Sequence, residues 1–468
     1  MSSQRIGKLF GHLEANPTSA ATASAPAEVF PNVVLDPENR MSVDPVHFLI
    51  EAGRKNPGCF MLERSKNNKF VVVTDVEMFE DVLTYDDCFG NPVTPNMSVN
   101  KNVFGIPVEQ LEKYEQKAIG ALRPYILTNS DKLSDSIAAL LLKRMDSSLG
   151  QSGEMDLRDF GTNIFWPMTQ ALFGDGASQA NAPYLKDMFE DIDGNFNLAL
   201  KGKKIPAVTA AVDRAYNNFS AMIEESKRTG GCPIGPVAQM YDRVTEYSDP
   251  KLTAKLCTAA WWGGQGNTLP STVWTFGMIL ANPEIKKKVI QEVFDGPFKT
   301  QPNQAGEYDY ATLPYLTAAL KETLRMKTYS IAWRLVQKDC TLFSPQANKT
   351  FKFNKGDLIG LHFAMRHLDD RIHPQPEVFR PERFLGTGAG LSPTINGHRY
   401  AFAPFSAGMH KCAGYGLAML EIPVVAALIL RHYDMELIDP LPGMNYKEAF
   451  GVVGPDSKPA RIQYKKRA

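Results

Sequence analysis

Phe405-Ser406-Ala407-Gly408-Met409-His410-Lys411-Cys412-Ala413-Gly414 is the stretch of this 468-residue sequence that decides its fold. It places one cysteine in a glycine-flanked loop, just before an apolar segment that predicts a helix from about Tyr415. Glycines lack a Cβ atom, so the backbone can turn tightly and approach a flat group closely. Amides after Cys412 can point at its sulfur and moderate the charge of a thiolate. The pattern therefore indicates a metal ligand rather than an ordinary buried cysteine.

Two blocks upstream carry charged residues at a regular spacing. Lys321-Glu322-Thr323-Leu324-Arg325 puts a carboxylate and a guanidinium three residues apart, on one face of a predicted helix. Phe379-Arg380-Pro381-Glu382-Arg383-Phe384 supplies a further guanidinium. Glu322, Arg325 and Arg383 can form a satisfied buried network with a structural role. Alone, such a pair is usually a solvated surface ion pair, so its weight comes from its order and spacing relative to the cysteine loop.

Together these blocks resemble the cytochrome P450 family, and the cysteine segment is similar to the family's haem-binding loop. The resemblance implies a mainly α fold with a minor β component, with haem between a long distal helix and a proximal cysteine loop and helix. It implies haem b (iron protoporphyrin IX) held by the thiolate of Cys412, which favours O–O cleavage. Within the loop, Phe405, Gly408 and Gly414 are the further residues expected to contact the haem.

The two propionates of haem require basic groups nearby. His410, two residues before the cysteine, is placed for this role, and Arg334 resembles the family's propionate-binding arginine. A surface salt bridge is the alternative for Arg334. Another cation is expected from the helix near Lys113 to Arg123, where Lys113, Lys117 and Arg123 are equal candidates.

Trp261-Trp262-Gly263-Gly264-Gln265-Gly266-Asn267-Thr268-Leu269-Pro270-Ser271-Thr272-Val273-Trp274 resembles the helix that crosses the distal face of the haem. Family members commonly carry an acid and a threonine where this sequence has Gly266 and Asn267. The replacement is similar to the branch that contains cholesterol 7α-hydroxylase, sterol 12α-hydroxylase and prostacyclin synthase. Two of these are monooxygenases, and one rearranges an endoperoxide. The resemblance makes Gly266, Asn267 and Thr268 the candidate catalytic residues.

Pro270 predicts an opening in this helix without reference to any family. Proline cannot donate to the carbonyl four residues earlier, which belongs to Gly266. Because Gly263 and Gly264 also remove bulk, the freed carbonyl, the Asn267 amide and a water can surround a small ligand such as dioxygen. The alternative is that the glycines only permit close helix packing and that the three tryptophans of the stretch are core anchors.

Composition indicates a large soluble enzyme. Its 51 basic and 51 acidic residues balance, so nothing indicates affinity for nucleic acid or for anionic membranes. The six cysteines show neither close pairing nor zinc-finger spacing, which suits a reducing compartment without disulfides. Residues 1–30 lack the run of about twenty apolar residues that a membrane span needs. We expect a flexible tail over 1–30, one catalytic domain over 31–468, a monomer, and a cytoplasmic location, although a processed chain would look the same.

Helical patterns dominate the predicted secondary structure. Apolar periodicity predicts helices over 109–122, 131–147, 156–172, 183–200, 206–228, 251–281, 284–294, 314–326 and 415–432. Residues 59–63 and 70–74 predict a β-hairpin, and 333–363 is rich in strand formers. Residues 386–400 are expected to form a long loop before the cysteine.

The implied activity is a monooxygenase that inserts one oxygen atom from O2, the co-substrate, into a lipophilic substrate, with a sterol or terpenoid favoured by the branch. No flavin or iron–sulfur motif is visible, so electrons are expected from a separate ferredoxin, flavodoxin or reductase. Lys411 is a candidate for docking that partner, with a merely solvated lysine as the equal alternative. The substrate pocket is expected to involve 89–107, Phe196, Leu198, Gln265, Gly266 and 330–333.

Two other functions stay open at this point. The departure at Gly266 and Asn267 also fits an electron-independent haem-thiolate isomerase or dehydratase that acts on a lipid peroxide or endoperoxide. A haem carrier or sensor without turnover is the third class. It is disfavoured because the distal glycines and the basic residues of the cysteine loop would then have no role.

Overall fold

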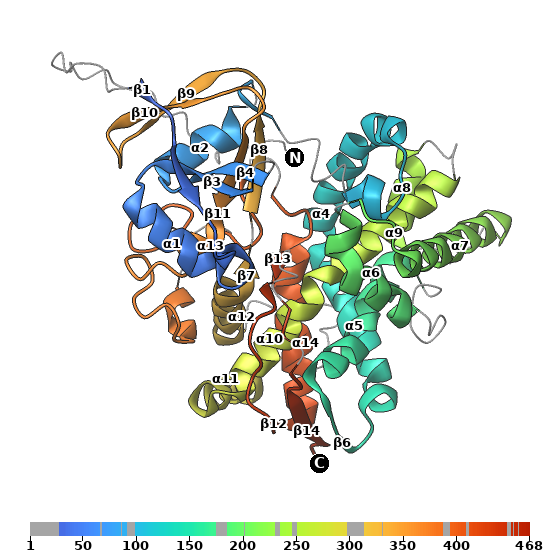
Figure 1. Cartoon of the computed structure of the whole chain (residues 1–468). Helices are drawn as coiled ribbons and strands as arrows, with labels where there is room; N and C mark the ends of the chain where they lie inside the picture. Colours follow the sequence, from blue (N-terminus) through green and yellow to red (C-terminus); the bar gives the residue numbers. More distant parts are fainter. Residues whose placement is uncertain are drawn as a thin grey trace, which may run out of the picture.

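The computed structural model describes residues 28–468, apart from 66–67, 86, 91–98, 175–184, 201, 230–234, 246–249, 297–312, 330, 387–393, 409–410, 447–450, 453 and 457. The long helices fill one side of the molecule, and most of the strands gather on the other side together with the short helices Pro45–Lys55, Glu77–Thr84 and Phe363–His367 (Figure 1). The expected mainly α fold with a minor β component is confirmed.

Helices follow the predicted apolar periodicity in most places. The described helices are α1 (Pro45–Lys55), α2 (Glu77–Thr84), α4 (Val108–Leu149), α5 (Leu157–Phe173), α6 (Leu185–Leu200), α7 (Pro206–Thr229), α8 (Pro236–Val244), α9 (Pro250–Gly266), α10 (Thr268–Leu280), α11 (Pro283–Asp295), α12 (Pro314–Lys327), α13 (Phe363–His367) and α14 (Tyr415–His432). The sequence did not reveal α1, α2, α8 and α13, which are short.

The prediction of two helices over 109–122 and 131–147 was wrong, because α4 runs through both. Pro124 lies inside α4 without ending it. Ile126 and Leu133, which follow this proline, are both buried, and α4 packs along α14 and α5. Burial of these side chains outweighs the local signal for a break.

Four small sheets complete the fold. Their strands are β1 (Glu28–Val29), β2 (Asn32–Leu35), β3 (Cys59–Ser65), β4 (Asn68–Val73), β5 (Phe89–Gly90), β6 (Ser152–Asp156), β7 (Thr328–Tyr329), β8 (Ile331–Val336), β9 (Cys340–Ser344), β10 (Lys349–Phe353), β11 (Leu358–His362), β12 (Tyr433–Leu437), β13 (Gly451–Val452) and β14 (Arg461–Lys466). The largest has the order β2-β3-β4-β11-β8-β5, and the others are β1-β10-β9, β12-β14-β6 and β13-β7. The predicted hairpin is confirmed as the antiparallel pair β3–β4.

Three helices carry the segments that the sequence singles out. α10, α12 and α14 contact one another pairwise and run side by side through the centre of the molecule (Figure 1). Among the described residues, α14 is the one helix long and apolar enough to cross a membrane, and 67% of that stretch is buried inside the protein. The core thus places the end of the distal helix, the Glu322–Arg325 segment and the helix after Cys412 close together.

Candidate active site

The distal helix is interrupted where the sequence predicted. Asn267 separates α9 from α10. Pro270 has no N–H for the Gly266 carbonyl, and the Ser271 N–H donates to the Asn267 carbonyl over 3.1 Å. The Thr268 hydroxyl donates to the Gly264 carbonyl over 2.7 Å, so a side chain satisfies one acceptor of the opened turn.

The glycines of α9 are not required by packing against other helices. A Cβ atom added to Gly263 or Gly264 would meet no atom within 4 Å. A Cβ at Gly266 would lie 3.3 Å from the ring of Trp262, one turn earlier in the same helix. Close helix packing therefore does not explain these glycines, which leave open space at the break.

Asn267 connects the break to the C-terminal part of the chain. Its side-chain Oδ1 accepts a hydrogen bond from the Val452 N–H over 2.8 Å. Gly451 approaches so closely that a Cβ there would lie 2.1 Å from Oδ1, and its φ of +77° is one that side chains disfavour. The sequence argument had the Asn267 amide facing a small ligand, whereas its oxygen is engaged by β13.

A cavity of about 150 Å³ lies beside the break. Gly266, Asn267 and Pro270 line it, together with Phe196 and Trp262, whose rings stack with centroids 4.3 Å apart. Of the predicted pocket residues, Phe196 and Gly266 thus lie on this cavity. Leu198 was expected beside Phe196 but is 41% exposed, and Gln265 is buried with its Nε2 donating to the Trp261 carbonyl.

The cysteine loop is held by its own backbone. The Cys412 N–H donates to the Phe405 carbonyl over 2.9 Å. Gly408 has a φ of +71°, and a Cβ there would lie 3.2 Å from the Leu83 Cβ, so close approach to α2 requires glycine at this turn. These contacts hold the described residues on either side of 409–410 and place Cys412 just before α14.

Charges and amides around the Cys412 sulfur act in opposite directions on its pKa. Burial is the largest influence and raises the pKa of the thiol. Hydrogen bonds from the Gly414 and Tyr415 amides and the positive charge of Arg123 lower it. These groups favour the thiolate, which is the form that binds a metal.

The surroundings of Cys412 fit a haem. The Cys412 side chain is accessible, and enough protein surrounds it that burial is the largest influence on its pKa. A Cβ added to Gly414, after the cysteine, would meet nothing within 4 Å. A thiolate with amide donors beside open space is the donor arrangement expected for haem iron.

Of the basic groups considered for the haem, Arg334 is buried and Arg123 is half-buried. Arg334 is 3% exposed in β8, where its Nη1 donates to the Trp333 carbonyl, so a surface salt bridge does not describe it. Arg123 in α4 donates to the Lys411 carbonyl over 2.6 Å. His410 lies outside the described residues.

The other lysines near this region contact aromatic rings. Nζ of Lys113 lies 4.8 Å from the ring centroid of Tyr114, and Nζ of Lys117 lies 5.9 Å from the same centroid. Lys411 lies over the Tyr415 ring at 4.4 Å, and burial lowers its pKa. Of the three equal candidates in α4, Arg123 is the one that the structure joins to the cysteine loop.

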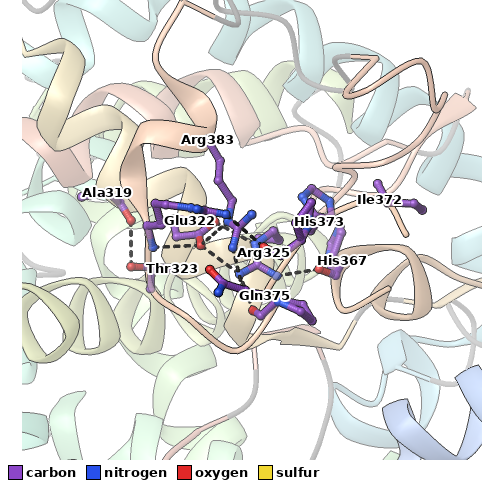
Figure 2. Close-up of polar contacts among 12 residues, drawn as sticks. Ala319, Glu322, Thr323, Arg325, His367, Ile372, His373, Gln375 and Arg383 are labelled. Carbon is purple, nitrogen blue, oxygen red and sulfur yellow. Dashed lines mark hydrogen bonds and ion pairs between the residues drawn. The ribbon is translucent and has the colours of Figure 1, made fainter. Parts of the chain in front are cut away.

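Glu322, Arg325 and Arg383 meet in one buried network (Figure 2). Arg325 donates Nε and Nη2 to the two oxygens of Glu322 over 2.7 and 2.9 Å, and both side chains are 0% exposed. Arg383 donates its Nε to Glu322 Oε1 over 3.1 Å, and so does the Arg380 N–H. The carboxylate is thus fully hydrogen-bonded, as a buried charge requires.

Two histidines extend the network to the cysteine loop. Arg325 Nη1 donates to the carbonyl of His367, whose Nε2 accepts from the Ala403 N–H over 3.0 Å. His373 Nε2 lies 3.0 Å from the Ala401 carbonyl. Sequence reasoning missed both histidines, because the contacts span 28 to 42 residues and follow no spacing rule.

A cysteine thiol with amide donors at the start of a core helix, in a mainly helical protein that also carries an opened helix, is the arrangement of a haem-thiolate protein. Residues 234–460 match the sequence model of the cytochrome P450 family. Mouse 24-hydroxycholesterol 7-alpha-hydroxylase is 25% identical over 91% of this chain and 89% of its own length. Human 7-alpha-hydroxycholest-4-en-3-one 12-alpha-hydroxylase is 30% identical over 44% of this chain and 43% of its own length. Pig cytochrome P450 7A1 is 28% identical over 46% of this chain and 46% of its own length.

The chain belongs to the cytochrome P450 family. It is an oxidoreductase of the monooxygenase type, and the family implies haem and O2. The matched region contains the distal helix, the Glu322–Arg325 segment and the cysteine loop.

We expect Glu322→Gln to destabilise the protein strongly. The amide leaves Arg325 buried without a countercharge, so the free energy of unfolding should fall by about 3–5 kcal/mol in urea titrations. Glu224→Gln, on the exposed face of α7, is the matched control and should change it by less than about 0.5 kcal/mol. Equal effects of both substitutions would contradict the role of the network.

Acid should destabilise the fold through His373. Burial lowers the pKa of His373 to about 4 from its ordinary 6.5. The unfolded chain therefore binds a proton below pH 6.5 that the folded chain refuses until about pH 4, so stability falls as pH decreases through this window. His373 accounts for about 3 kcal/mol of that loss. His373→Gln should flatten the dependence of the unfolding free energy on pH, and an unchanged slope would refute this.

Gly451→Ala should show how tightly β13 is bound to the distal break. The added methyl strains a positive φ, at about 1–2 kcal/mol, and collides with Asn267 Oδ1, at about 1–3 kcal/mol more. Gly397→Ala is the control, since Gly397 has a φ of +80° and open space around its Cβ position. The midpoint temperature of thermal unfolding should be lower for Gly451→Ala than for Gly397→Ala. The reverse order would exclude the contact between Gly451 and Asn267.

Proposed function

We propose that this protein is a sterol monooxygenase. The observation that carries the proposal is the match over nine tenths of the chain to a relative named as a hydroxylase of 24-hydroxycholesterol, together with the opened distal helix that faces a cavity. When bound, haem supplies O2 activation and the transfer of one oxygen atom. The chain supplies the ligand, the position of the substrate and the protons.

On the proximal side, Cys412 holds the iron of haem b. Amides of Gly414 and Tyr415 stabilise the thiolate, and the Phe405 carbonyl fixes the Cys412 backbone. Arg334 and Arg123 hold the propionates, with His410 as a third donor. Arg334 is buried and Arg123 half-buried, and an anion such as a propionate is a suitable partner for a guanidinium in such surroundings.

On the distal side, Gly266, Asn267 and Thr268 guide protons. The Thr268 hydroxyl gives its hydrogen to Gly264, so its oxygen remains an acceptor for a water at the opened turn. Pro270 leaves the Gly266 carbonyl without its usual helical donor, which provides a second acceptor there. An acid is therefore replaced by backbone and hydroxyl groups that orient water.

Cavity volume beside the break supports a small-molecule substrate. The cavity beside Asn267 and a second space of about 430 Å³ share Arg158, Val273 and Pro455 in their walls, so the two adjoin. Their combined volume falls within the about 300–1,000 Å³ typical of small-molecule sites. Phe196 and Trp262 add two stacked aromatic rings to the wall of the smaller cavity, which suits a fused-ring substrate.

A separate reductase-type partner supplies the electrons, and Lys411 contributes to its docking surface. The proposal places residues 31–468 in one catalytic domain of a cytoplasmic monomer. Isomerisation of a lipid peroxide without electrons is less favoured, because the relatives named above are hydroxylases. Rapid consumption of a lipid hydroperoxide by enzyme without any donor would reverse this preference.

Replacement of the ligand tests the haem site. Cys412→Ser should abolish the carbon monoxide difference band from which the family takes its name, since a hydroxyl cannot replace the thiolate. Cys59→Ser, a change of the same kind at a buried cysteine of β3, should keep the band in whatever protein folds. A band that persists in Cys412→Ser would remove the proposed ligand.

Substrate class is tested by a panel of sterols, terpenoids and fatty acids. A sterol that binds to the haem-loaded protein should produce a low-spin to high-spin shift in its spectrum, and reductase with O2 should then give a hydroxylated product. Asn267→Ala should change the ratio of product to electrons consumed far more than it changes haem content. Fatty acids that shift the spin state while sterols do not would contradict the proposed substrate class.

A further inference from the structure

Arg366 lacks a partner although protein covers much of its side chain. It lies in α13 and is half-buried, and its Nε is fully covered without a hydrogen bond. Within the described part of the chain, none of its nitrogens makes a hydrogen bond or an ion pair. A guanidinium keeps its charge at neutral pH, even though burial lowers the pKa of Arg366. A covered positive charge of this kind needs a partner.

A small cavity borders Arg366. Its volume is about 20 Å³, slightly more than a single water molecule needs, which is about 10–15 Å³. The charged side chains in its wall are those of Arg54, Arg366, Arg371 and Asp369. Three positive groups and one negative group therefore surround room for one small particle, and an anion would balance their surplus charge.

The carboxylate in the wall is engaged by another arginine. Asp369 is 3% exposed and accepts hydrogen bonds from the Arg371 N–H over 3.0 Å, from its Nε over 2.9 Å and from its Nη2 over 2.5 Å. Arg54 donates its Nη2 to the neighbouring Asp370 over 2.5 Å. Both carboxylates of this segment are therefore committed to arginines other than Arg366.

Asp75 is the other negative group whose charge reaches Arg366. One of its oxygens accepts from the Ser344 hydroxyl over 2.5 Å and from the Gln346 N–H over 3.0 Å. Its other oxygen accepts from the Glu77 N–H over 3.0 Å. These bonds fix the carboxylate just before α2. Asp75 thus moderates the positive charge from a distance without supplying a partner.

His362 brings a second unpaired group to the cavity. It is 0% exposed and lines the wall, and both of its ring nitrogens are buried without a partner among the described residues. Burial lowers the pKa of His362 to about 3, so the ring is neutral and carries one N–H. Two residues of the wall therefore carry donors that nothing in the described chain uses.

Close packing of the walls limits what can enter the cavity. Gly53 of α1 lies in the wall, where an added Cβ would be 2.9 Å from Thr74 Cγ2 and 3.1 Å from Met365 Cε. The space therefore cannot widen much unless α1 moves away from α13. A phosphate or carboxylate ligand has several heavy atoms and exceeds the room for about one water molecule, whereas a halide ion does not.

We propose that this cavity is a binding site for a chloride ion, which accepts hydrogen bonds from Arg366 and balances the surplus positive charge of the wall. The site lies between α1, the end of β4 and α13. It is outside the proposed active site and does not rest on the proposed substrate. The ion is a structural ligand, and its binding changes no covalent bond.

A bound ion would stabilise the segment that leads to the cysteine loop. Arg366 directly precedes His367, which joins Arg325 to the Ala403 N–H. The like charge of Arg371 acts on Arg366, and an anion between them reduces this repulsion. The Leu368 N–H donates to the Ala364 carbonyl over 3.2 Å at the end of α13. Its exchange with solvent should therefore be slower in chloride.

Thermal unfolding of the full-length holoenzyme tests the site. Sodium chloride replaces sodium gluconate at constant ionic strength, so the screening of surface charges stays the same. The midpoint should rise along a saturating curve, by about 1–2 °C at a chloride concentration tenfold above the dissociation constant. Hydrogen exchange at Leu368 should slow over the same range of concentration. A midpoint that does not depend on chloride would overturn the proposal.

Arg366→Met is the variant that removes the site. Methionine keeps a long apolar stem but has neither the donors nor the charge, so the rise of the midpoint with chloride should vanish. Arg228→Met is the matched control, since Arg228 in α7 is 72% exposed, and it should retain the full rise. A chloride response in Arg366→Met as large as in the wild-type protein would refute the site.

Crystals of the wild-type holoenzyme in bromide locate the ion and do not depend on a variant that folds. Bromide replaces chloride and scatters anomalously, so a peak should lie within hydrogen-bonding distance of the Arg366 guanidinium. A water molecule alone at this position would overturn the proposal. So would an ion that binds at crystal concentration only, without a saturable effect of chloride on thermal unfolding.

Discussion

The buried ion pair between Glu322 and Arg325 is the interaction on which the rest of the structure depends. Two opposite charges at 0% exposure are costly to remove from water unless every hydrogen bond is made. Here the remaining donors of Arg325 reach the carbonyls of His367 and Pro376, which fixes the chain that leads to the cysteine loop. Because His367 in turn accepts the Ala403 N–H, the charge pair is joined through one histidine to the chain just before the cysteine loop. Selecting this geometry, rather than adding stability, is the physical role of such a pair.

The opened distal helix supplies the second constraint. Pro270 removes one helical bond and Thr268 satisfies a neighbouring carbonyl, so the turn at Asn267 stays open without leaving a run of unpaired groups. The hydrogen bond from the Val452 N–H to Asn267 Oδ1 joins this opening to β13. β13 pairs with β7, which directly follows α12, the helix that carries Glu322 and Arg325. The two sides of the proposed haem site are therefore mechanically connected through α12. A substitution in β13 would therefore alter the turn at Asn267 without altering the residues around Cys412.

Local chemistry made the cysteine loop, the opening at Pro270 and the β-hairpin predictable from sequence, because each is encoded within about ten residues. What sequence could not show depends on long-range contacts. The continuity of α4 through Pro124 results from packing on α14 and α5, and the engagement of Asn267 by Val452 joins residues 185 apart. The same limit applies to Arg123. The sequence could not separate it from Lys113 and Lys117, whereas the structure shows that it donates to the Lys411 carbonyl.

The central claim is that the Cys412 sulfur is bonded to haem iron. X-ray absorption at the iron edge of the haem-loaded full-length protein tests this bond directly, because sulfur scatters differently from nitrogen and oxygen. The account predicts one sulfur neighbour beside the porphyrin nitrogens in the wild-type protein. A first coordination sphere that contains only nitrogen and oxygen would contradict it.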